Sequence, residues 1–355
     1  MEAYLDNSAT TRVDAQVQEL MKKLMDVDFG NPSSRHQKGV VAEGYIKEAR
    51  QKIAATLKVD PKEFIITSGG TESNNMALIG TALAAKRKGN HIITTAVEHP
   101  SVKATASFLE EQGFRITFLS VDSRGQISLE DLKEALTPDT ILVSIMYVNN
   151  EIGTIQPVEE AAKLVHATVP GAVFHVDAIQ AYGKVMIRPK QQGIDLLSVS
   201  SHKFHGPKGA GFLYCSSKVN LHPIIFGGGQ QSGMRSGTEN VPGAVGMGLA
   251  AQLAYQNFEQ KKTHLNELRR YFLEGIHKLD DVSINGWDET ADGEECIDKR
   301  APHIVSVSFT GVRSEVLLNA LSDRGIYVSS GSACSSNHPA LSSTCLLYTS
   351  DAADE

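Results

Sequence analysis

The sequence predicts an α/β protein: a mostly parallel central sheet with helices on both faces, followed by a smaller α+β domain at the C-terminal end. Two observations support this fold class. Between about residues 62 and 214, short apolar runs bounded by turn residues alternate with segments of helical periodicity, which is the pattern of parallel strands joined by helices. After the glycine-rich stretch 227–233, the pattern changes to a long helical region and a few shorter elements.

Seven runs of four to seven residues read as strands, because apolar and β-branched residues fill them and turn residues bound them. The predicted strands cover residues 63–67, 91–95, 115–120, 141–147, 172–176, 196–200 and 211–214. Alanine and leucine at helical spacing predict helices between them. These helices cover residues 71–88, 101–112, 128–136 and 158–168.

The C-terminal part is predicted to begin within a long helical region, 241–279, in which apolar residues such as Leu265, Leu268 and Phe272 recur at helical spacing. A strand (303–309), a helix (314–324) and a short strand (326–328) follow. The acidic run 287–299 reads as a solvated loop. We therefore expect an N-terminal segment (1–14) that packs with the small domain, a large domain (15–258) and a small domain (259–343).

Composition narrows the classes of function. A net charge of −7 argues against nucleic acid as a main partner, because phosphate binding favours a basic surface. No run of apolar residues is long enough to span a membrane, and the first residues do not resemble a secretory signal. The four cysteines have no metal-ligand spacing, so we expect no metal, free thiols and a cytoplasmic location.

Lys203 is the most informative residue. It lies in a run of small polar residues (200–209) directly after a predicted apolar strand, and Asp177 ends the preceding predicted strand. Pyridoxal phosphate needs such a pair, because a carboxylate keeps its pyridine nitrogen protonated and a lysine holds its aldehyde. The alternative is an ordinary lysine in a surface turn.

Other polar residues follow predicted strands and should lie at the same edge of the sheet. Gly70 and Thr71 open a helix and could bind a phosphate through backbone amides, although the same residues suit an ordinary helix cap. His99 could stack on a flat ring and move protons, or be a plain loop histidine. Asn150 could donate a hydrogen bond to a ring oxygen, or be a turn residue.

Cys334 lies in a loop of small, polar residues, 329–337. A thiol on a mobile loop suits a nucleophile that must reach two places, whereas structural cysteines usually lie among apolar neighbours. The alternative is a tolerated surface cysteine. Cys215, within a predicted strand, is expected in the core. Cys296 lies among carboxylates, which should raise its pKa and make it less reactive.

Taken together, these segments resemble the cysteine desulfurases of the NifS/IscS type, within the class V aminotransferase group of pyridoxal phosphate enzymes. The resemblance rests on residues 4–11, 31–34, 67–75, 98–99, 148–153, 175–180, 200–209, 234–238 and 329–336. It implies the pyridoxal phosphate-dependent transferase fold, of the aspartate aminotransferase-like kind, and a homodimer.

The resemblance also implies a role for each matching residue. Lys203 would form the Schiff base with the cofactor, Asp177 would pair with the pyridinium, and Gln180 and Asn150 would contact the ring oxygen. His99 would stack on the ring. The cofactor phosphate would be bound by Gly70, Thr71, Ser200 and His202, with Thr238 arriving from the other subunit. Asn7 and Asn150 would bind the substrate.

The implied reaction takes sulfur from L-cysteine, gives L-alanine and leaves a persulfide on Cys334, with Lys203 and His99 as the groups that move protons. The sulfur would pass to an iron–sulfur scaffold or a tRNA-thiolation carrier. Two alternatives share the cofactor chemistry: a selenocysteine lyase and a cysteine-sulfinate desulfinase. A third is a non-catalytic protein that binds pyridoxal phosphate and serves as a partner.

The chain departs from the family near its C-terminal end. The family has an arginine there that binds the substrate carboxylate, and no arginine follows Arg324. We therefore expect a truncated chain, residues 344–355 being a non-native tail. Loss of the arginine would remove a charge-assisted contact worth about 1.5–3 kcal/mol.

Overall fold

The computed structural model describes residues 2–331 and 344. Its largest sheet has seven strands in the order β2-β8-β7-β6-β5-β3-β4, in which only β8 runs antiparallel to its neighbours. This confirms the prediction of a mostly parallel sheet. The strands are β2 (Phe64–Thr67), β3 (His91–Thr95), β4 (Arg115–Leu119), β5 (Thr140–Met146), β6 (Val173–Asp177), β7 (Leu196–Ser200) and β8 (Gly211–Cys215).

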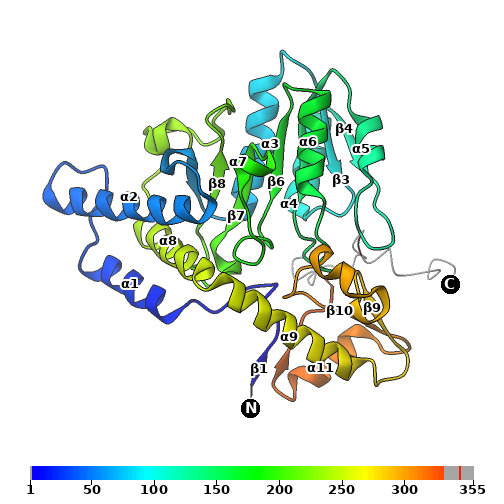
Figure 1. Ribbon diagram of the computed structural model, residues 1–355. Coiled ribbons are helices and arrows are strands. Elements are labelled where there is room, and N and C mark those ends of the chain that lie inside the picture. The colour runs from blue at the N-terminus through cyan, green and yellow to red at the C-terminus, as the bar shows by residue number, and fades with distance from the viewer. Residues whose placement is uncertain (1, 332–343, 345–355) are drawn as a thin grey trace.

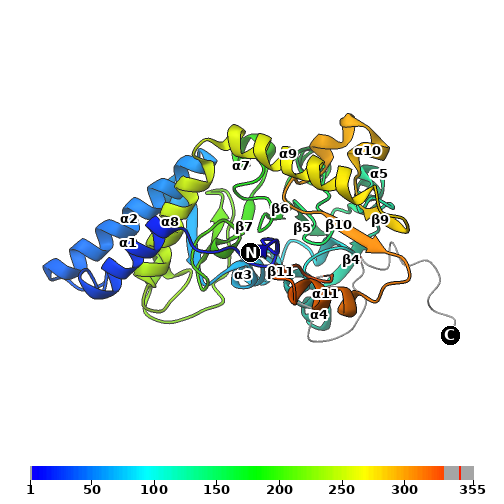
Figure 2. The same cartoon turned by 90° about the horizontal axis from the view of Figure 1, so that it is seen from below.

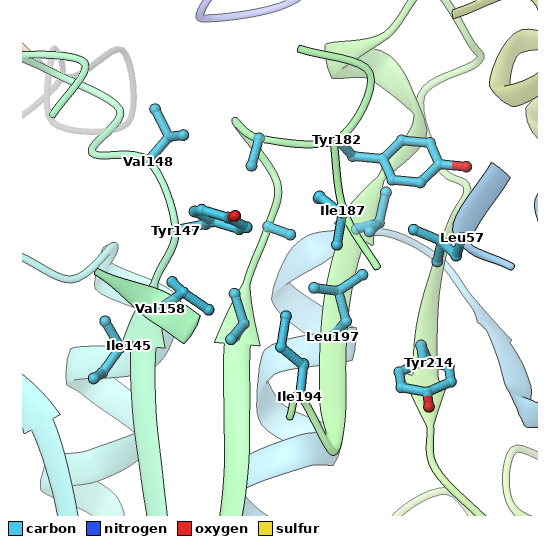
Figure 3. Close-up of a cluster of buried hydrophobic side chains, with 14 of the residues drawn as sticks. Leu57, Ile145, Tyr147, Val148, Val158, Tyr182, Ile187, Ile194, Leu197 and Tyr214 are labelled. Carbon is cyan, nitrogen blue, oxygen red and sulfur yellow. The ribbon is translucent and has the colours of Figure 1, made fainter. Parts of the chain in front are cut away.

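Helices cover both faces of this sheet, as predicted (Figure 1). Neighbouring residues of one strand point to opposite faces. Ile92 accordingly packs in the core with Leu78 and Leu109 of α3 and α4, whereas Ile93 packs in the core with Leu132 and Val165 of α5 and α6. The helices are α3 (Gly70–Ala85), α4 (Pro100–Glu111), α5 (Leu129–Ala135) and α6 (Val158–Thr168). Figure 3 shows part of the core that contains Ile93, in the region around Leu197 and Tyr147.

Three helices form a layer that extends from one end of the sheet (Figures 1 and 2). They are α1 (Ala15–Asp26), α2 (Gln37–Leu57) and α8 (Val241–Tyr255). α2 and α8 approach closely where Gly248 faces Ala49, since a Cβ on Gly248 would lie 2.8 Å from the Cα of Ala49. Small residues such as Ala49 therefore allow α2 to pack closely against α8.

The predicted helical region 241–279 is two helices. α8 ends at Tyr255 and α9 (Phe258–Ile276) begins after Asn257, whose φ of 55° cannot continue a helix. α9 leads into the smaller C-terminal part, where β9 (Val282–Asn285) pairs antiparallel with β10 (Ser306–Phe309). The short helices and turns elsewhere are η1 (Pro61–Glu63), α7 (Pro189–Gln192), η2 (Ser201–Lys203) and η3 (Gln230–Gly233).

The N-terminal segment joins the C-terminal part through a parallel pair of short strands. β1 (Ala3–Tyr4) pairs with β11 (Ile326–Tyr327), which follows α11 (Ser314–Ser322). Figure 2 shows β11 next to the N-terminus of the chain. In residues 2–331, no helix combines the length and the apolar character needed to cross a membrane.

The acidic segment 287–299 is not the solvated loop that its composition suggested. It contains α10 (Glu289–Asp292) and η4 (Glu294–Lys299), and it covers a buried ion cluster. Glu289 lies between two guanidinium groups, 3.1 Å from Arg269 Nε and 2.8 Å from Arg300 Nη2, and both arginine side chains are only 2% exposed. The Glu289 carboxylate therefore lies in the interior, where it neutralises two buried arginines.

This cluster predicts a large cost for the loss of Glu289. The substitution Glu289→Gln leaves two buried guanidinium groups without a counter-charge, so we expect the free energy of unfolding to fall by about 3 kcal/mol. The matched control is Glu267→Gln on α9, because the Glu267 side chain is 61% exposed and its ion pair with His264 is long, at 3.9 Å. Chemical denaturation measures both. Equal stability of the two variants would contradict the structural role of the cluster.

Candidate active site

Nine of the residues predicted for the site line one cavity at the carboxyl end of the parallel strands. They are Gly70, Thr71, His99, Asn150, Asp177, Gln180, Ser200, His202 and Lys203. They come from the ends of β2, β3, β5, β6 and β7, or from the turns that follow. The sheet therefore brings together residues that lie up to 133 positions apart, from Gly70 to Lys203.

Lys203 is held by the N-terminal segment. It lies in the η2 turn after β7, half-buried, and its Nζ donates to the carbonyl oxygens of Ser8 (2.5 Å) and Ala9 (2.8 Å). Gln180 Nε2 donates to the same Ser8 oxygen at 2.9 Å. Backbone oxygens thus form one wall of the cavity and hold the amine in it.

Asp177, the last residue of β6, is a buried carboxylate with an exposure of 4%. Its Oδ2 accepts a hydrogen bond from Asn74 Nδ2 at 2.8 Å, and its Oδ1 accepts one from the Ile179 amide at 3.0 Å. In the described part of the chain it forms no ion pair. A buried carboxylate with only neutral donors favours a cation in the cavity beside it.

The start of α3 is suited to an anion. Gly69 occupies the N-cap position without a side chain that could accept from the first amides, so these donors face outward. A Cβ on Gly70 would lie 2.1 Å from Ile179 Cδ1, so a larger residue would require the Ile179 side chain to move. The Ser200 side chain lies near both Gly69 and Gly70. The backbone amides at the start of α3 therefore form an anion-binding site that suits a phosphate group, and we call this site the anion seat.

His202 and His99 also face the cavity. Burial, followed by the charges of Lys203 and Lys208, lowers the pKa of His202 to about 4, so its imidazole is neutral at neutral pH. His202 Nδ1 lies 3.2 Å from Thr10 Oγ1. His99 is the N-cap residue of α4, and its Nδ1 accepts from the Ser101 amide at 3.1 Å. His99 also lines the cavity.

The neighbouring residues Asn149 and Asn150 have different surroundings. Asn149 is buried and structural, since its Oδ1 accepts from the amides of Glu151 (2.9 Å) and Ile152 (3.0 Å). Asn150 lines the cavity. The predicted contact of Asn150 with a ring oxygen is compatible with this position.

Two predicted site residues in the described part of the chain, Asn7 and Thr238, do not line the cavity. Asn7 is exposed, and its amide donates to the Tyr4 carbonyl at 3.3 Å. Thr238 is exposed on the segment before α8, and its predicted role in another subunit's site stays a prediction. Cys334 lies outside the described residues. Ser329 and Gly331, just before it, line the cavity.

The buried carboxyl of Glu98 was not predicted. It lies beside His99, is 4% exposed, and accepts from the Met146 amide (2.7 Å) and from Thr95 Oγ1 (2.9 Å) through Oε1. Burial, and then the charge of Asp177, raises its pKa to about 8. Glu98 is therefore protonated at neutral pH. Its only sequence signal is its position next to His99.

The cysteines in the described part of the chain, Cys215 and Cys296, both have raised pKa values. Burial, followed by the charges of Asp195 and Glu63, raises the pKa of Cys215 to about 12. Burial is also the main cause that raises the pKa of Cys296, and the charge of Glu289 adds to it. The predicted direction for Cys296 is confirmed, although burial rather than charge is the largest cause. Neither thiol is suited to nucleophilic attack.

Comparison with known proteins places the chain in a family. The family model described as aminotransferase class-V matches residues 3–347. The chain is 46% identical to a protein named cysteine desulfurase IscS from Dictyoglomus turgidum, over 95% of this chain and 83% of that protein. A solved structure titled NIFS-like protein superimposes with a TM-score of 0.88 at 41% identity, covering 93% of this chain and 88% of the other.

A further solved structure is titled SspA in complex with cysteine. It has a TM-score of 0.83 and 33% identity, and covers 98% of this chain and 95% of that one. The chain therefore belongs to the class-V aminotransferase family and, within it, to the cysteine desulfurases. Its cofactor is pyridoxal 5′-phosphate, and the cavity has the groups that this cofactor needs: an amine, a buried carboxylate and an anion seat.

Glu98 gives the site a measurable dependence on pH. The folded state keeps the Glu98 proton up to about pH 8, whereas glutamate ordinarily has a pKa of 4.5. The folded state therefore binds one more proton than the unfolded state between these values. The contribution of the Glu98 proton to the free energy of unfolding is complete below pH 4.5. It falls by about 1.4 kcal/mol per pH unit as the pH rises from 4.5 to about 8.

We expect Glu98→Gln to remove this loss, so that the variant gains stability relative to the parent as the pH rises through this window. Denaturant unfolding at a series of pH values measures it. The control is Glu19→Gln on the exposed side of α1, which should run parallel to the parent. A constant difference between Glu98→Gln and the parent would show that Glu98 is already ionised in the folded protein.

Proposed function

We propose that this chain removes sulfur from L-cysteine, releases L-alanine and leaves the sulfur as a persulfide on Cys334. The observation that carries the proposal is the pairing of Lys203 and Asp177 in one cavity, beside an anion seat at the start of α3. The similar solved structure titled SspA in complex with cysteine supports L-cysteine as the substrate.

Four parts of the cavity would hold the cofactor. Lys203 would bind its aldehyde, Asp177 would pair with its ring nitrogen, and Gln180 and Asn150 would lie beside its ring oxygen. Gly70, Thr71, Ser200 and His202 would bind its phosphate. When bound, pyridoxal phosphate supplies a carbonyl that captures amines and a ring that accepts electrons from the bonds next to the captured nitrogen.

The chain's own residues move the protons. The Lys203 amine takes the proton from Cα of cysteine and returns it later, and the carbonyls of Ser8 and Ala9 stabilise the ammonium that forms, because they already accept hydrogen bonds from Nζ. His99, which also lines the cavity, is the second proton carrier.

Sulfur transfer then needs a thiolate. The Cys334 thiolate attacks the substrate sulfur, an S–S bond forms, and the C–S bond breaks with its electron pair left on the substrate carbon. Protonation of that carbon gives alanine. The net change is cysteine plus thiol to alanine plus persulfide, and no external oxidant or reductant is required.

The chain before Cys334 supports its role. Ser329 and Gly331 line the cavity, and Ser329 Oγ is held 2.6 Å from Asp6 Oδ1. Two residues separate Gly331 from Cys334, so the chain from one Cα to the other spans at most about 11 Å. Cys334 therefore follows within a short distance of residues that line the cavity, which supports its proposed attack on the substrate sulfur.

We further propose a homodimer in which Thr238 of each chain completes the phosphate seat of the other. The sulfur would pass to an acceptor protein in the cytoplasm, either an iron–sulfur scaffold or a tRNA-thiolation carrier. The names of the IscS relatives support the iron–sulfur route. Residues 15–258 would hold the cofactor, and residues 259–343 would carry the Cys334 loop.

The test compares Cys334→Ser with Cys215→Ser, because Cys215 is a cysteine whose raised pKa keeps it unreactive. With L-cysteine and a reductant, the parent and Cys215→Ser should release alanine and sulfide in equal amounts. Cys334→Ser should bind the cofactor yet lose alanine release and the persulfide, measured by amino-acid analysis and mass spectrometry. Alanine release by Cys334→Ser at the parent rate would contradict the proposal.

The same variants separate the alternative reactions. Release of alanine from cysteine sulfinate or selenocysteine that exceeds release from cysteine, and that does not depend on Cys334, would favour a desulfinase or a lyase. A bound cofactor whose absorbance does not respond to L-cysteine would favour the non-catalytic protein.

A further inference from the structure

Asp177 and His99 are joined by a line of buried hydrogen bonds through two residues to which the function above gives no role. Asn74 Nδ2 lies 2.8 Å from Asp177 Oδ2 and 2.9 Å from Ser101 Oγ. Ser101 Oγ in turn lies 2.8 Å from His99 Nδ1. Asn74 has no exposed surface and Ser101 is 8% exposed, so water does not compete for these bonds.

The direction of each hydrogen bond follows from chemistry. A carboxylate only accepts, so the Asn74 group facing Asp177 must be the NH₂, and its second hydrogen points to Ser101. The Ser101 oxygen accepts that hydrogen, so its own hydrogen is donated to His99 Nδ1. The reverse orientation would place the Asn74 carbonyl against a carboxylate, which both groups disfavour.

His99 Nδ1 receives a second donor. The Ser101 backbone amide points at the same nitrogen from 3.1 Å. A ring nitrogen that accepts from an amide and from a hydroxyl carries no hydrogen, so the neutral imidazole has its hydrogen on Nε2. The network thus determines which His99 nitrogen is a donor and which way the ring faces.

We propose that Asn74 and Ser101 are positioning residues that tie His99 to Asp177 and fix the His99 hydrogen on Nε2. The network joins three elements: Asn74 is in α3, Ser101 in α4, and Asp177 ends β6. Thr105 Oγ1 also donates to the Ser101 carbonyl at 2.7 Å, which holds the first turn of α4 in place. The consequence of this hydrogen-bond network for catalysis rests on the proposed function, whereas the network itself does not.

The first test needs no activity. Histidine labelled with ¹⁵N in the cofactor-free protein reports the hydrogen of each ring nitrogen, and His99→Ala assigns the signals. In the parent, His99 Nδ1 should be unprotonated and Nε2 protonated. In Ser101→Ala and in Asn74→Ala, both signals should move towards the average of two exchanging tautomers. The control Asn75→Ala changes the neighbouring asparagine, which donates to the Thr71 carbonyl on the outer side of α3.

Unchanged His99 signals in both variants, or an Nδ1–H tautomer in the parent, would overturn the proposal. Ser101→Ala removes a single hydroxyl and retains the backbone donor, so it remains informative if Asn74→Ala folds poorly. Circular dichroism and thermal unfolding of the three variants separate a loss of fold from a loss of ring orientation.

The second test measures coupling in the holoenzyme. Each single variant should lower kcat about tenfold, as expected for one lost hydrogen bond, with a smaller change in KM. The double variant should lose little more than either one, because both act through the same His99 ring. Fold-losses that multiply would show that the two residues act independently. Normal tautomers with no desulfurase activity would instead count against the proposed function alone.

Discussion

The buried carboxylate of Asp177 is the constraint around which this molecule is arranged. It ends a central strand, has almost no exposure, and is contacted by an amide side chain and a backbone amide rather than by a cation. A charge buried in this way costs several kcal/mol unless a counter-charge comes to it. In the proposed function, the protonated ring of pyridoxal phosphate would supply that charge to Asp177, whereas Glu98 next to the site is protonated and neutral.

The N-terminal segment connects the two parts of the molecule to this site. Its first strand pairs with β11 of the C-terminal part, its middle offers Ser8 and Ala9 carbonyls to Lys203, and Thr11 bonds to the His202 carbonyl at 2.9 Å. The loop after Asn150 adds a second connection, because the Ala301 amide donates to the Gly153 carbonyl at 2.7 Å. The small C-terminal part is therefore connected to Lys203 through the N-terminal segment.

The sequence predicted the sheet and most of the cavity because both depend on local patterns. Strand ends such as Asp177 and Ser200 are marked by a change from apolar to polar residues, and parallel strands put such ends on one edge. Glu98 and Asn74 escaped prediction because their role depends on burial and on partners about 50 to 100 residues away in the chain. α2 gave no predicted element, since glycine, alanine and threonine alternate with the larger apolar residues of its buried face. Glu289 looked solvated until Arg269 and Arg300 were placed beside it.

The most direct test of this account is reduction of the holoenzyme with borohydride, followed by peptide mapping. Borohydride converts a Schiff base between lysine and the cofactor into a stable bond, so the modified peptide identifies the lysine. The account predicts one pyridoxyl group per chain, on Lys203, and none after an excess of L-cysteine has displaced that lysine. Modification of another lysine, or no modification in protein that retains the cofactor, would contradict the assignment of Lys203 and Asp177 as the pair that holds it.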